Sequence, residues 1–328
     1  MTPRTRRSLL ATVLSVTLAA ALTAPAGAAP RASGALDYLR QISGHYTIAG
    51  QHNKEPASQP SQYTAKAHDI TGQYPGLWGG DLFFAAADVA NRQKVVDQAK
   101  LEWSHGAIVT LTWHMCPPTQ GSSCDWATGV ESDLNDSQWA ELLRDGSDLD
   151  NRYKARLDEA VPYLRQLRDA GVQVLFRPLH ELNDGWAWWG GRPGANGSAA
   201  LYRLTHDYLV SKGLTNIVWV WAVKDLDMGQ AGQYYPGAQY VDVAALDVWM
   251  KPNSSASDYQ TMLDIAQGKP IALGETGTIP SPELLAAQPR WTYFMEWSEY
   301  LQGANSNAAI QRTYFDGRVL VLTEMGRG

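Results

Sequence analysis

The 328-residue chain lacks the sequence patterns of several large protein classes. It has no H-E-x-x-H pair, which places two zinc ligands on one helix face, and its seven histidines are scattered. It also has no G-x-S-x-G turn, which presents the nucleophile of α/β-hydrolases. Charged residues make up only 18% of the chain, and the formal net charge is −6. These absences disfavour zinc hydrolases, serine hydrolases and proteins that bind nucleic acid or anionic membrane surfaces.

Cysteine is scarce, since only Cys116 and Cys124 occur. Both fall within one expected loop. In an exported protein a short-range disulfide is favoured over two free thiols, because oxidising compartments promote pairing. A metal site would need further ligands close by. We therefore predict a disulfide between these two residues and no metal or organic cofactor.

Phenylalanine is also scarce, with 5 residues against 13 tryptophans and 15 tyrosines. A buried core can use phenylalanine, whereas tryptophan and tyrosine combine a flat apolar face with a hydrogen-bonding tip. Some of the tryptophans must belong to the core of a chain this long. The excess nevertheless favours a site for a ligand that has both apolar faces and hydroxyl groups.

The N-terminal segment has the pattern of a targeting signal. Three arginines precede an apolar run over residues 9–22, and Ala-Gly-Ala at 26–28 matches a cleavage site. The run is too short for a membrane anchor and is followed by Pro25. Residues 5–10 resemble a twin-arginine signal, although ordinary secretion signals also contain paired arginines. We predict a cleaved signal over residues 1–28 and an extracellular mature chain.

Residues 29–328 alternate apolar strand-like runs with segments of helical periodicity. The expected strands are Tyr46–Gln51, Pro75–Leu82, Ala107–His114, Val172–His180, Asn216–Ala222, Val241–Val248, Lys269–Glu275 and Tyr293–Trp297. The expected helices are Gln62–Ile70, Val89–Ser104, Leu149–Ala170, Ala199–Lys212 and Tyr259–Gln267. No repeat or linker divides the chain. The pattern predicts one α/β domain, a (β/α)8 TIM barrel, with long loops around 116–147 and 224–240.

The fourth expected strand ends in an unusual group of residues. Arg177, His180 and Glu181 follow one another closely, and a glycine turn then leads to Trp186 and two further tryptophans. Burying this much charge is unfavourable unless the groups pair with one another or with a ligand. Flat indole faces beside a proton donor suit a sugar ring. This stretch therefore indicates a carbohydrate-processing site.

Glu181 has a counterpart in Glu275, which ends the seventh expected strand. In a TIM barrel the carboxyl ends of the strands meet at one face, where catalytic residues lie. Glycosidic hydrolysis needs one carboxyl to protonate the leaving oxygen and a second to attack the anomeric carbon or to activate water. The pair therefore predicts a glycoside hydrolase, and spacing along the chain leaves retaining and inverting mechanisms open.

These motifs resemble those of glycoside hydrolase family 26, whose members are mostly endo-β-1,4-mannanases. The resemblance rests on Arg-Pro-Leu-His-Glu at 177–181 and Gly-Trp-x-Trp-Trp-Gly at 185–190, and extends from about Gly50 to the C-terminus. It implies a retaining mechanism with Glu181 as acid/base and Glu275 as nucleophile. It also implies a β-mannan polysaccharide or oligosaccharide as substrate. Another β-glycan, such as β-1,3-xylan or mixed-linkage β-glucan, stays open, as does a non-catalytic polysaccharide-binding barrel.

The resemblance also suggests how sugar is bound. It implies that His114 and His180 contact the sugar next to the cleaved bond, with Trp186 as a stacking wall and Trp297 facing that sugar. The full set of expected substrate-binding residues is His114, Arg177, His180, Trp186, Trp189, Trp221, Trp249 and Trp297. We expect Arg177 to lie near both carboxylates and keep the nucleophile ionised, or to pair with Asp81 or Asp247. A monomer is expected.

The chain departs from the family pattern at three positions. Trp249 stands where the family has a tyrosine whose hydroxyl bonds to the nucleophile. Ala187 replaces one aromatic residue, and Ser298 follows Trp297 where some members carry a sugar-binding arginine. Tryptophans in sugar clefts usually stack, so we expect Trp249 to lie flat against substrate. An edge-on ring, which would donate its single N–H to Glu275, is the alternative.

Overall fold

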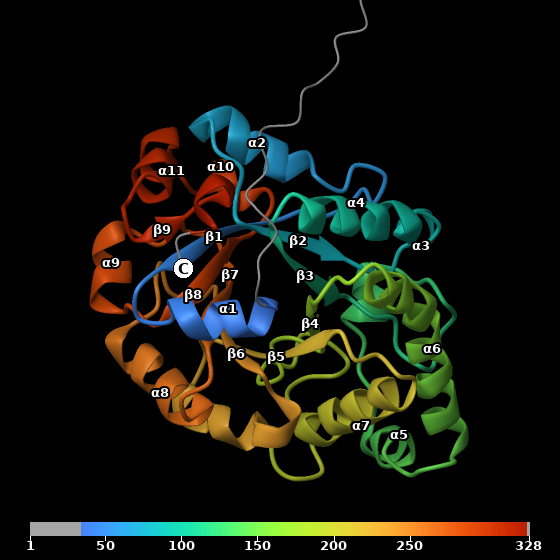
Figure 1. Cartoon of the computed structure of the whole chain (residues 1–328). Helices are drawn as coiled ribbons and strands as arrows, with labels where there is room; N and C mark the ends of the chain where they lie inside the picture. Colours follow the sequence, from blue (N-terminus) through green and yellow to red (C-terminus); the bar gives the residue numbers. More distant parts are fainter. Residues whose placement is uncertain (1–33, 327–328) are drawn as a thin grey trace, which may run out of the picture.

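The computed structural model of the chain describes residues 34–326, in which eight parallel strands close into a barrel (Figure 1). The predicted signal over residues 1–28 lies outside the described residues. The strands are β1 (Thr47–His52), β2 (Leu77–Asp81), β3 (Ile108–Trp113), β4 (Val174–Pro178), β5 (Ile217–Lys224), β6 (Val243–Val248), β7 (Ile271–Thr276) and β8 (Trp291–Glu296). Each pairs with its neighbours in sequence, and β1 pairs with both β8 and β2, which closes the sheet. The predicted TIM barrel and all eight strands are confirmed.

Helices surround the barrel, as the sequence pattern predicts (Figure 1). They are α2 (Gln62–Thr71), α3 (Ala86–Val89), α4 (Arg92–Ser104), α5 (Asp136–Leu142), α6 (Asp148–Asp169), α7 (Ser198–Ser211), α8 (Ala256–Ala266), α9 (Pro282–Ala287), α10 (Tyr300–Gly303) and α11 (Asn307–Tyr314). In the described chain β5 is joined to β6 without an α-helix, through the short 3₁₀ turns η2 (Met228–Tyr234) and η3 (Ala238–Tyr240). This connection matches the long loop expected over 224–240.

The longest helix, α6, shows why these segments pack on the sheet. Ser147 caps its first turn by accepting a hydrogen bond from the Asp150 amide, and Gly171 follows its end with a φ of +73°. Its apolar residues recur at helical spacing and are buried, including Leu157 and Leu164 with no exposed surface. Burying one such leucine stabilises the fold by roughly 1.5–3 kcal/mol. The apolar stripe therefore fixes α6 against the barrel.

The amino-terminal end of the barrel is closed by a helix that we did not predict. Helix α1 (Ala35–Ile42) crosses this opening, and its Leu39 and Ile42 are buried (Figure 1). They belong to one apolar cluster with residues that point into the barrel, such as Leu175 of β4. A short ninth strand, β9 (Val319–Leu320), pairs with the first two residues of β1 and was also not predicted. Because this end of the barrel interior is filled, the open mouth of the barrel lies at the carboxyl ends of the strands.

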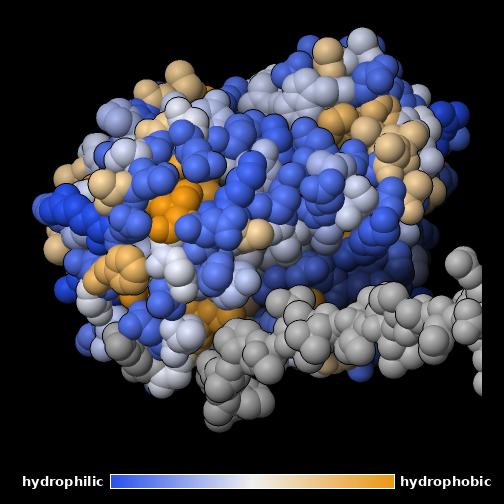
Figure 2. Space-filling view, turned by 90° about the horizontal axis from the view of Figure 1, so that it is seen from above, coloured by the Kyte–Doolittle hydropathy of each residue, from blue (hydrophilic) through white to orange (hydrophobic). Residues whose placement is uncertain are grey.

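The outer surface of the barrel is mostly hydrophilic on the face seen in Figure 2. Figure 2 shows one flank, where hydrophilic side chains predominate and apolar atoms surface in small separate patches. Among the described residues, none of the helices has both the length and the apolar character needed to cross a bilayer.

Candidate active site

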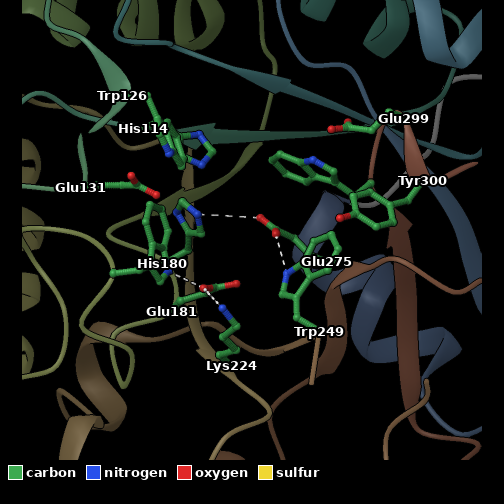
Figure 3. Close-up of a pocket in the computed structure, with 12 residues that line it drawn as sticks. His114, Trp126, Glu131, His180, Glu181, Lys224, Trp249, Glu275, Glu299 and Tyr300 are labelled. Atoms are coloured by element: carbon green, nitrogen blue, oxygen red, sulfur yellow. Dashed lines mark hydrogen bonds and ion pairs between the residues drawn. The ribbon is translucent and has the colours of Figure 1, made fainter. Parts of the chain in front are cut away.

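The carboxyl ends of the barrel strands surround an open cleft of about 400 Å³ (Figure 3). Both predicted catalytic carboxylates line it, one from each side. The complete lining is His114, Trp126, Glu131, His180, Glu181, Trp186, Lys224, Trp249, Glu275, Trp297, Glu299 and Tyr300. The structure thus brings together residues that are far apart in sequence, because all of them follow strands whose carboxyl ends meet at one face.

A β-bulge aims Glu275 into the cleft. In the pairing of β6 with β7, Leu246 faces Leu273 but the next residue, Asp247, faces Glu275, so Gly274 is left over. Regular alternation would turn Glu275 toward the helices, and the extra residue restores it to the barrel interior. A Cβ at Gly274 would collide with the Asp247 carboxylate, so only glycine fits the bulge.

Arg177 lies beneath Glu275 and is 1% exposed. Its guanidinium donates hydrogen bonds to Glu275 Oε1 and, over 2.6 Å, to Asp247 Oδ2. Although burial disfavours its charge, these two carboxylates raise the pKa of Arg177. Arg177 thus contacts one of the two predicted carboxylates, Glu275, and also makes the alternative ion pair with Asp247. Direct substrate contact by Arg177 was wrong, because the side chain is buried behind Glu275 and does not line the cleft.

Trp249 supplies the second hydrogen bond to Glu275. Its Nε1–H donates to Glu275 Oε2 over 3.1 Å, so the expectation of a flat, stacking ring was wrong (Figure 3). The backbone explains this orientation, since buried Asp225 accepts hydrogen bonds from the amides of Trp249, Met250 and Lys251. The ring also fills the space above Gly277, where a Cβ would lie 3.0 Å from the indole.

Glu181 has a different environment. It follows β4 with a φ of +52°, a left-handed conformation that is costly for a residue with a side chain. Its Oε2 accepts hydrogen bonds from Trp186 Nε1 and lies 3.3 Å from Lys224 Nζ. Burial, and then the negative charge of Glu275, raise the pKa of Glu181 to about 7. Such a carboxyl holds a proton near neutral pH and can donate it.

The two carboxylates lie close enough to act on one bond. Glu181, Glu275 and Asp247 offer oxygens that are all within 4.8 Å of one another. A cluster of three acidic groups is also a geometry in which a cation can bind. Here Arg177 already supplies a positive charge to two of the three carboxylates, and we assign no metal to the cluster.

Two histidines also line the cleft. Burial, and then the charge of Arg177, hold the pKa of His180 well below its usual range, and its Nε2 lies 3.9 Å from Glu275 Oε1. His114 behaves differently. Burial opposes its charge, but the contact of its Nδ1 with the Asp81 carboxylate raises the pKa of His114. The site therefore presents one neutral imidazole and one that is readily protonated.

Trp297 is held parallel to another ring. Its indole stacks on His52, with ring centres 3.8 Å apart and an angle of 8° between the planes. His52 Nδ1 in turn lies 2.8 Å from Ser298 Oγ. Ser298 is buried and braces His52. One face of Trp297 is thus covered, while the residue still lines the cleft.

Two predicted substrate contacts fall in the core. Trp189 and Trp221 have no exposed surface, and their indole N–H groups donate to the backbone carbonyls of His180 and Tyr234. Neither indole has a face available to a sugar, so these two assignments were wrong. A tryptophan at a strand end or after a turn can satisfy both its apolar ring and its N–H inside the protein. Of the three tryptophans after Glu181, only Trp186 lines the cleft.

Comparison with known proteins agrees with this geometry. The model of glycosyl hydrolase family 26 matches residues 26–323. The chain belongs to glycosyl hydrolase family 26.

Named relatives point in the same direction. A mannan endo-1,4-beta-mannosidase of Thermothelomyces thermophilus is 33% identical over 303 residues, covering 88% of this chain and 60% of that protein. The structure of GH26A from Muricauda sp. MAR_2010_75 is 34% identical with a TM-score of 0.83, covering 88% of this chain and 95% of that one. A beta-mannanase from a symbiotic protist of the termite Reticulitermes speratus, solved with gluco-manno-oligosaccharide, is 25% identical. Its TM-score is 0.77, and the match covers 92% of this chain and 97% of that one.

Within this family 26 barrel, Trp126 also lines the cleft, although the sequence did not indicate it. Its indole lies nearly parallel to Trp186, with ring centres 5.4 Å apart and an angle of 18° between the planes. Trp126 is 39% exposed and extends the aromatic wall of the cleft. It lies in the loop after β3 rather than near either catalytic motif, and its only sequence signal was its place two residues after Cys124.

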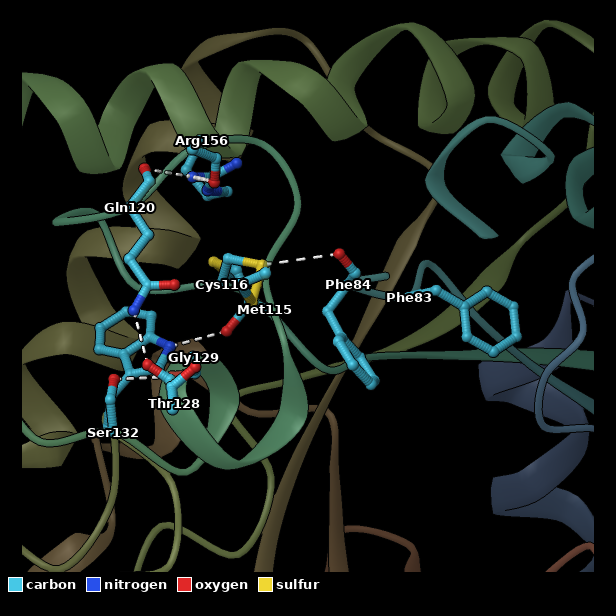
Figure 4. The surroundings of a disulfide bond; sticks show 12 residues. Phe83, Phe84, Met115, Cys116, Gln120, Thr128, Gly129, Ser132 and Arg156 are labelled. Carbon is cyan, nitrogen blue, oxygen red and sulfur yellow. Dashed lines mark hydrogen bonds between the residues drawn. A yellow bond between two sulfur atoms is a disulfide. The ribbon is translucent and has the colours of Figure 1, made fainter. Parts of the chain in front are cut away.

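The predicted disulfide is present beside Trp126. Cys116 and Cys124 are bridged, with Cα atoms 5.8 Å apart (Figure 4). A single π-helical turn, η1 (Trp126–Val130), begins two residues later. A Cβ at Gly129 would meet the Cys124 sulfur at 2.5 Å, so the turn packs directly on the bridge. The disulfide therefore ties the segment that carries Trp126 to the end of β3.

Proposed function

We propose that this protein is a secreted, retaining endo-β-1,4-mannanase that hydrolyses internal bonds of mannan, galactomannan or glucomannan. The relative from Thermothelomyces thermophilus is named a mannan endo-1,4-beta-mannosidase, and this chain spans 60% of its length. We further propose that residues 29–328 form the catalytic domain of a monomer after signal removal.

The observation that carries the proposal is the pairing of two differently prepared carboxylates. Oxygens of Glu181 and Glu275 lie within 4.8 Å, which supports the retaining spacing of about 5–5.5 Å rather than the wider inverting one. Glu275 accepts donors on both oxygens, which favours an ionised nucleophile. The pKa of Glu181, raised by burial to about 7, favours a proton donor.

In the first step Glu275 attacks the anomeric carbon while Glu181 transfers its proton to the glycosidic oxygen, and the leaving sugar departs with a new hydroxyl group. In the second step Glu181, now ionised, takes a proton from water. The resulting hydroxide attacks the anomeric carbon, the ester bond to Glu275 breaks, and Glu181 is protonated again. Two inversions give net retention.

The sugar that is attacked would lie among His114, His180, Trp186 and Trp297. Trp186 offers a face beside the acid, and Trp297 offers the face that His52 does not cover. Tryptophan faces suit the apolar C–H surfaces of a sugar ring, and imidazole nitrogens suit its hydroxyl groups. This arrangement makes no demand on a metal or an organic cofactor.

The test is hydrolysis of a panel of β-glycans by the purified mature chain. We expect release of reducing sugar from mannan, galactomannan and glucomannan. Products should be short oligosaccharides, with the β-anomer formed first in NMR spectra of the reaction. Preference for β-1,3-xylan or mixed-linkage β-glucan would overturn the substrate assignment. An α-anomer formed first would overturn retention, and no release from any glycan would favour a binding barrel.

A further inference from the structure

Lys224 is a cleft residue that sequence analysis did not single out. It ends β5, and its Nζ lies 3.3 Å from Glu181 Oε2 (Figure 3). The same Nζ lies 2.9 Å from Asp184 Oδ2. The side-chain amide of Asn183 hydrogen-bonds to both the N–H and the carbonyl of Lys224. The Lys224 N–H donates to Asn183 Oδ1 over 2.7 Å, and Asn183 Nδ2 donates to the Lys224 carbonyl over 2.8 Å. The end of β5 is therefore held in place, and from it the Lys224 ammonium reaches Glu181.

The titratable groups around Glu181 come from four strands and one loop. They are Arg177 and His180 on and after β4, Asp184 in the loop that follows, Lys224 on β5, Asp247 on β6 and Glu275 on β7. Arg177 directs its hydrogen bonds to Asp247 and Glu275. Within residues 34–326, Lys224 makes the one ion pair of Glu181.

Both donors to Glu181 use the same oxygen. Trp186 and Lys224 contact Oε2, and within the described residues Oε1 accepts no hydrogen bond. A carboxyl protonated on Oε1 thus keeps its proton directed away from the two donors, available to a glycosidic oxygen in the cleft. Although burial opposes its charge, Glu181 raises the pKa of Lys224, so the ammonium persists at neutral pH.

We propose that Lys224 is a positioning residue that orients Glu181 and sets the pH range in which Glu181 acts first as acid and then as base. The proposal rests on the proposed function. When Glu275 is esterified in the intermediate, its negative charge disappears, while the positive charge of Lys224 remains. The balance of nearby charge then favours ionised Glu181, which is the form that the second step needs.

Lys224→Met, which keeps the chain length and removes the charge, tests this. An opposite charge within about 4–6 Å shifts a carboxyl by 1–3 pH units, less where solvent reaches the pair. We expect the alkaline limb of kcat/KM on mannan to move up by about one pH unit. Where breakdown of the intermediate limits kcat, its acidic limb should move up as well. Lys224→Arg keeps the charge and should restore both limbs.

Lys212→Met is the matched control. Lys212 follows α7, pairs with Asp158 over 2.8 Å and lies outside the cleft. Its replacement by methionine therefore removes the same positive charge at a position away from Glu181. We expect its pH profile to match that of the parent. A lower rate in Lys224→Met with both limbs of the pH profile at their parent positions would overturn the proposal. Loss of packing alone lowers the height of the profile and does not shift its limbs.

A second measurement does not depend on turnover. The carboxyl carbon of Glu181, assigned in ¹³C-labelled protein with Glu181→Gln, should titrate at higher pH in Lys224→Met than in the parent. An unchanged titration would also overturn the proposal. Failure of the proposed function is distinguishable, since it would appear as no β-glycan hydrolysis by the parent, whatever the variants do.

Discussion

Glu181 and Glu275 are the same residue type at the ends of two strands of one barrel, yet their surroundings differ. Glu275 sits on a bulge above Arg177 and Asp247, and each of its oxygens accepts a hydrogen bond. Glu181 stands on a left-handed backbone, and both of its partners contact one oxygen. One carboxylate is surrounded by donors, while the other has an oxygen left for substrate.

This difference shows how a barrel assigns two roles to identical side chains. Donors that point at a carboxylate favour its ionised form, whereas burial and a neighbouring negative charge favour its protonated form. The proposed acid, Glu181, and the proposed nucleophile, Glu275, are therefore distinguished by the groups that β4, β5, β6 and β7 place around each of them.

Glu181→Ala and Glu275→Ala should both strongly reduce turnover of mannan. For Glu181→Ala, the loss of proton transfer alone should lower the rate by about 10²–10⁴-fold. An aryl mannoside with an acidic phenol needs no proton, so Glu181→Ala should still form the covalent intermediate and accumulate it. Azide should rescue Glu275→Ala and give an inverted product, detected by NMR. A retained azide product from Glu275→Ala would mean that the two roles are exchanged.

Arg177→Ala should lower both the yield of folded protein and kcat. Removing one partner of a buried ion pair costs about 3–5 kcal/mol of unfolding free energy, because Asp247 and Glu275 lose their counter-charge. Urea denaturation measures the first effect and initial rates measure the second. The control is Arg312→Ala, which breaks an exposed ion pair and should cost less than about 1 kcal/mol. A stable, fully active Arg177→Ala protein would contradict its placement.

The Trp249→Phe substitution removes the N–H bonded to Glu275 and keeps the ring. A hydrogen bond to a charged group contributes about 1.5–3 kcal/mol, so kcat should fall by roughly tenfold or more with KM unchanged. Trp249→Tyr, which restores a donor, serves as comparison and should recover part of the loss. A raised KM with unchanged kcat in Trp249→Phe would instead support the stacking orientation.

The rate should also depend on the protonation of Glu181. Its pKa is raised by burial and by Glu275 to about 7, and the first step needs the protonated form. Consequently kcat/KM on mannan should fall about tenfold per pH unit above this value. With an acidic phenol as leaving group this alkaline limb should disappear. A limb that persists there would assign the titration to another group.

Trp126→Ala should have the smallest effect, because Trp126 belongs to the wall and contacts neither carboxylate. A stacked aromatic pair contributes about 0.5–1.5 kcal/mol, so KM should rise by up to about tenfold while kcat stays the same. Phe315→Ala removes an exposed aromatic outside the cleft and should leave both constants unchanged. An equal change of KM in both variants would contradict the assignment of Trp126 to the substrate-binding wall.

Some of the site was readable from the sequence because the signal is local. Apolar runs alternating with helical segments predict the strands, and parallel strands must bring Glu181 and Glu275 to one face. The cysteine pair was predicted for the same reason, since its two members are eight residues apart. Trp189 and Trp221 were misassigned because their sequence position says nothing about burial.

The sequence by itself thus determined the barrel, the two carboxylates and the disulfide, because periodicity and short spacing act within one element or loop. Only the tertiary structure decided that Gly274 bulges to turn Glu275 inward, that Trp249 lies edge-on, and that Lys224 reaches Glu181. These contacts join residues 26 to 43 positions apart that meet only when β4 through β7 are in register. A side chain's direction at a strand end depends on the neighbouring strand, and barrel closure supplies that neighbour.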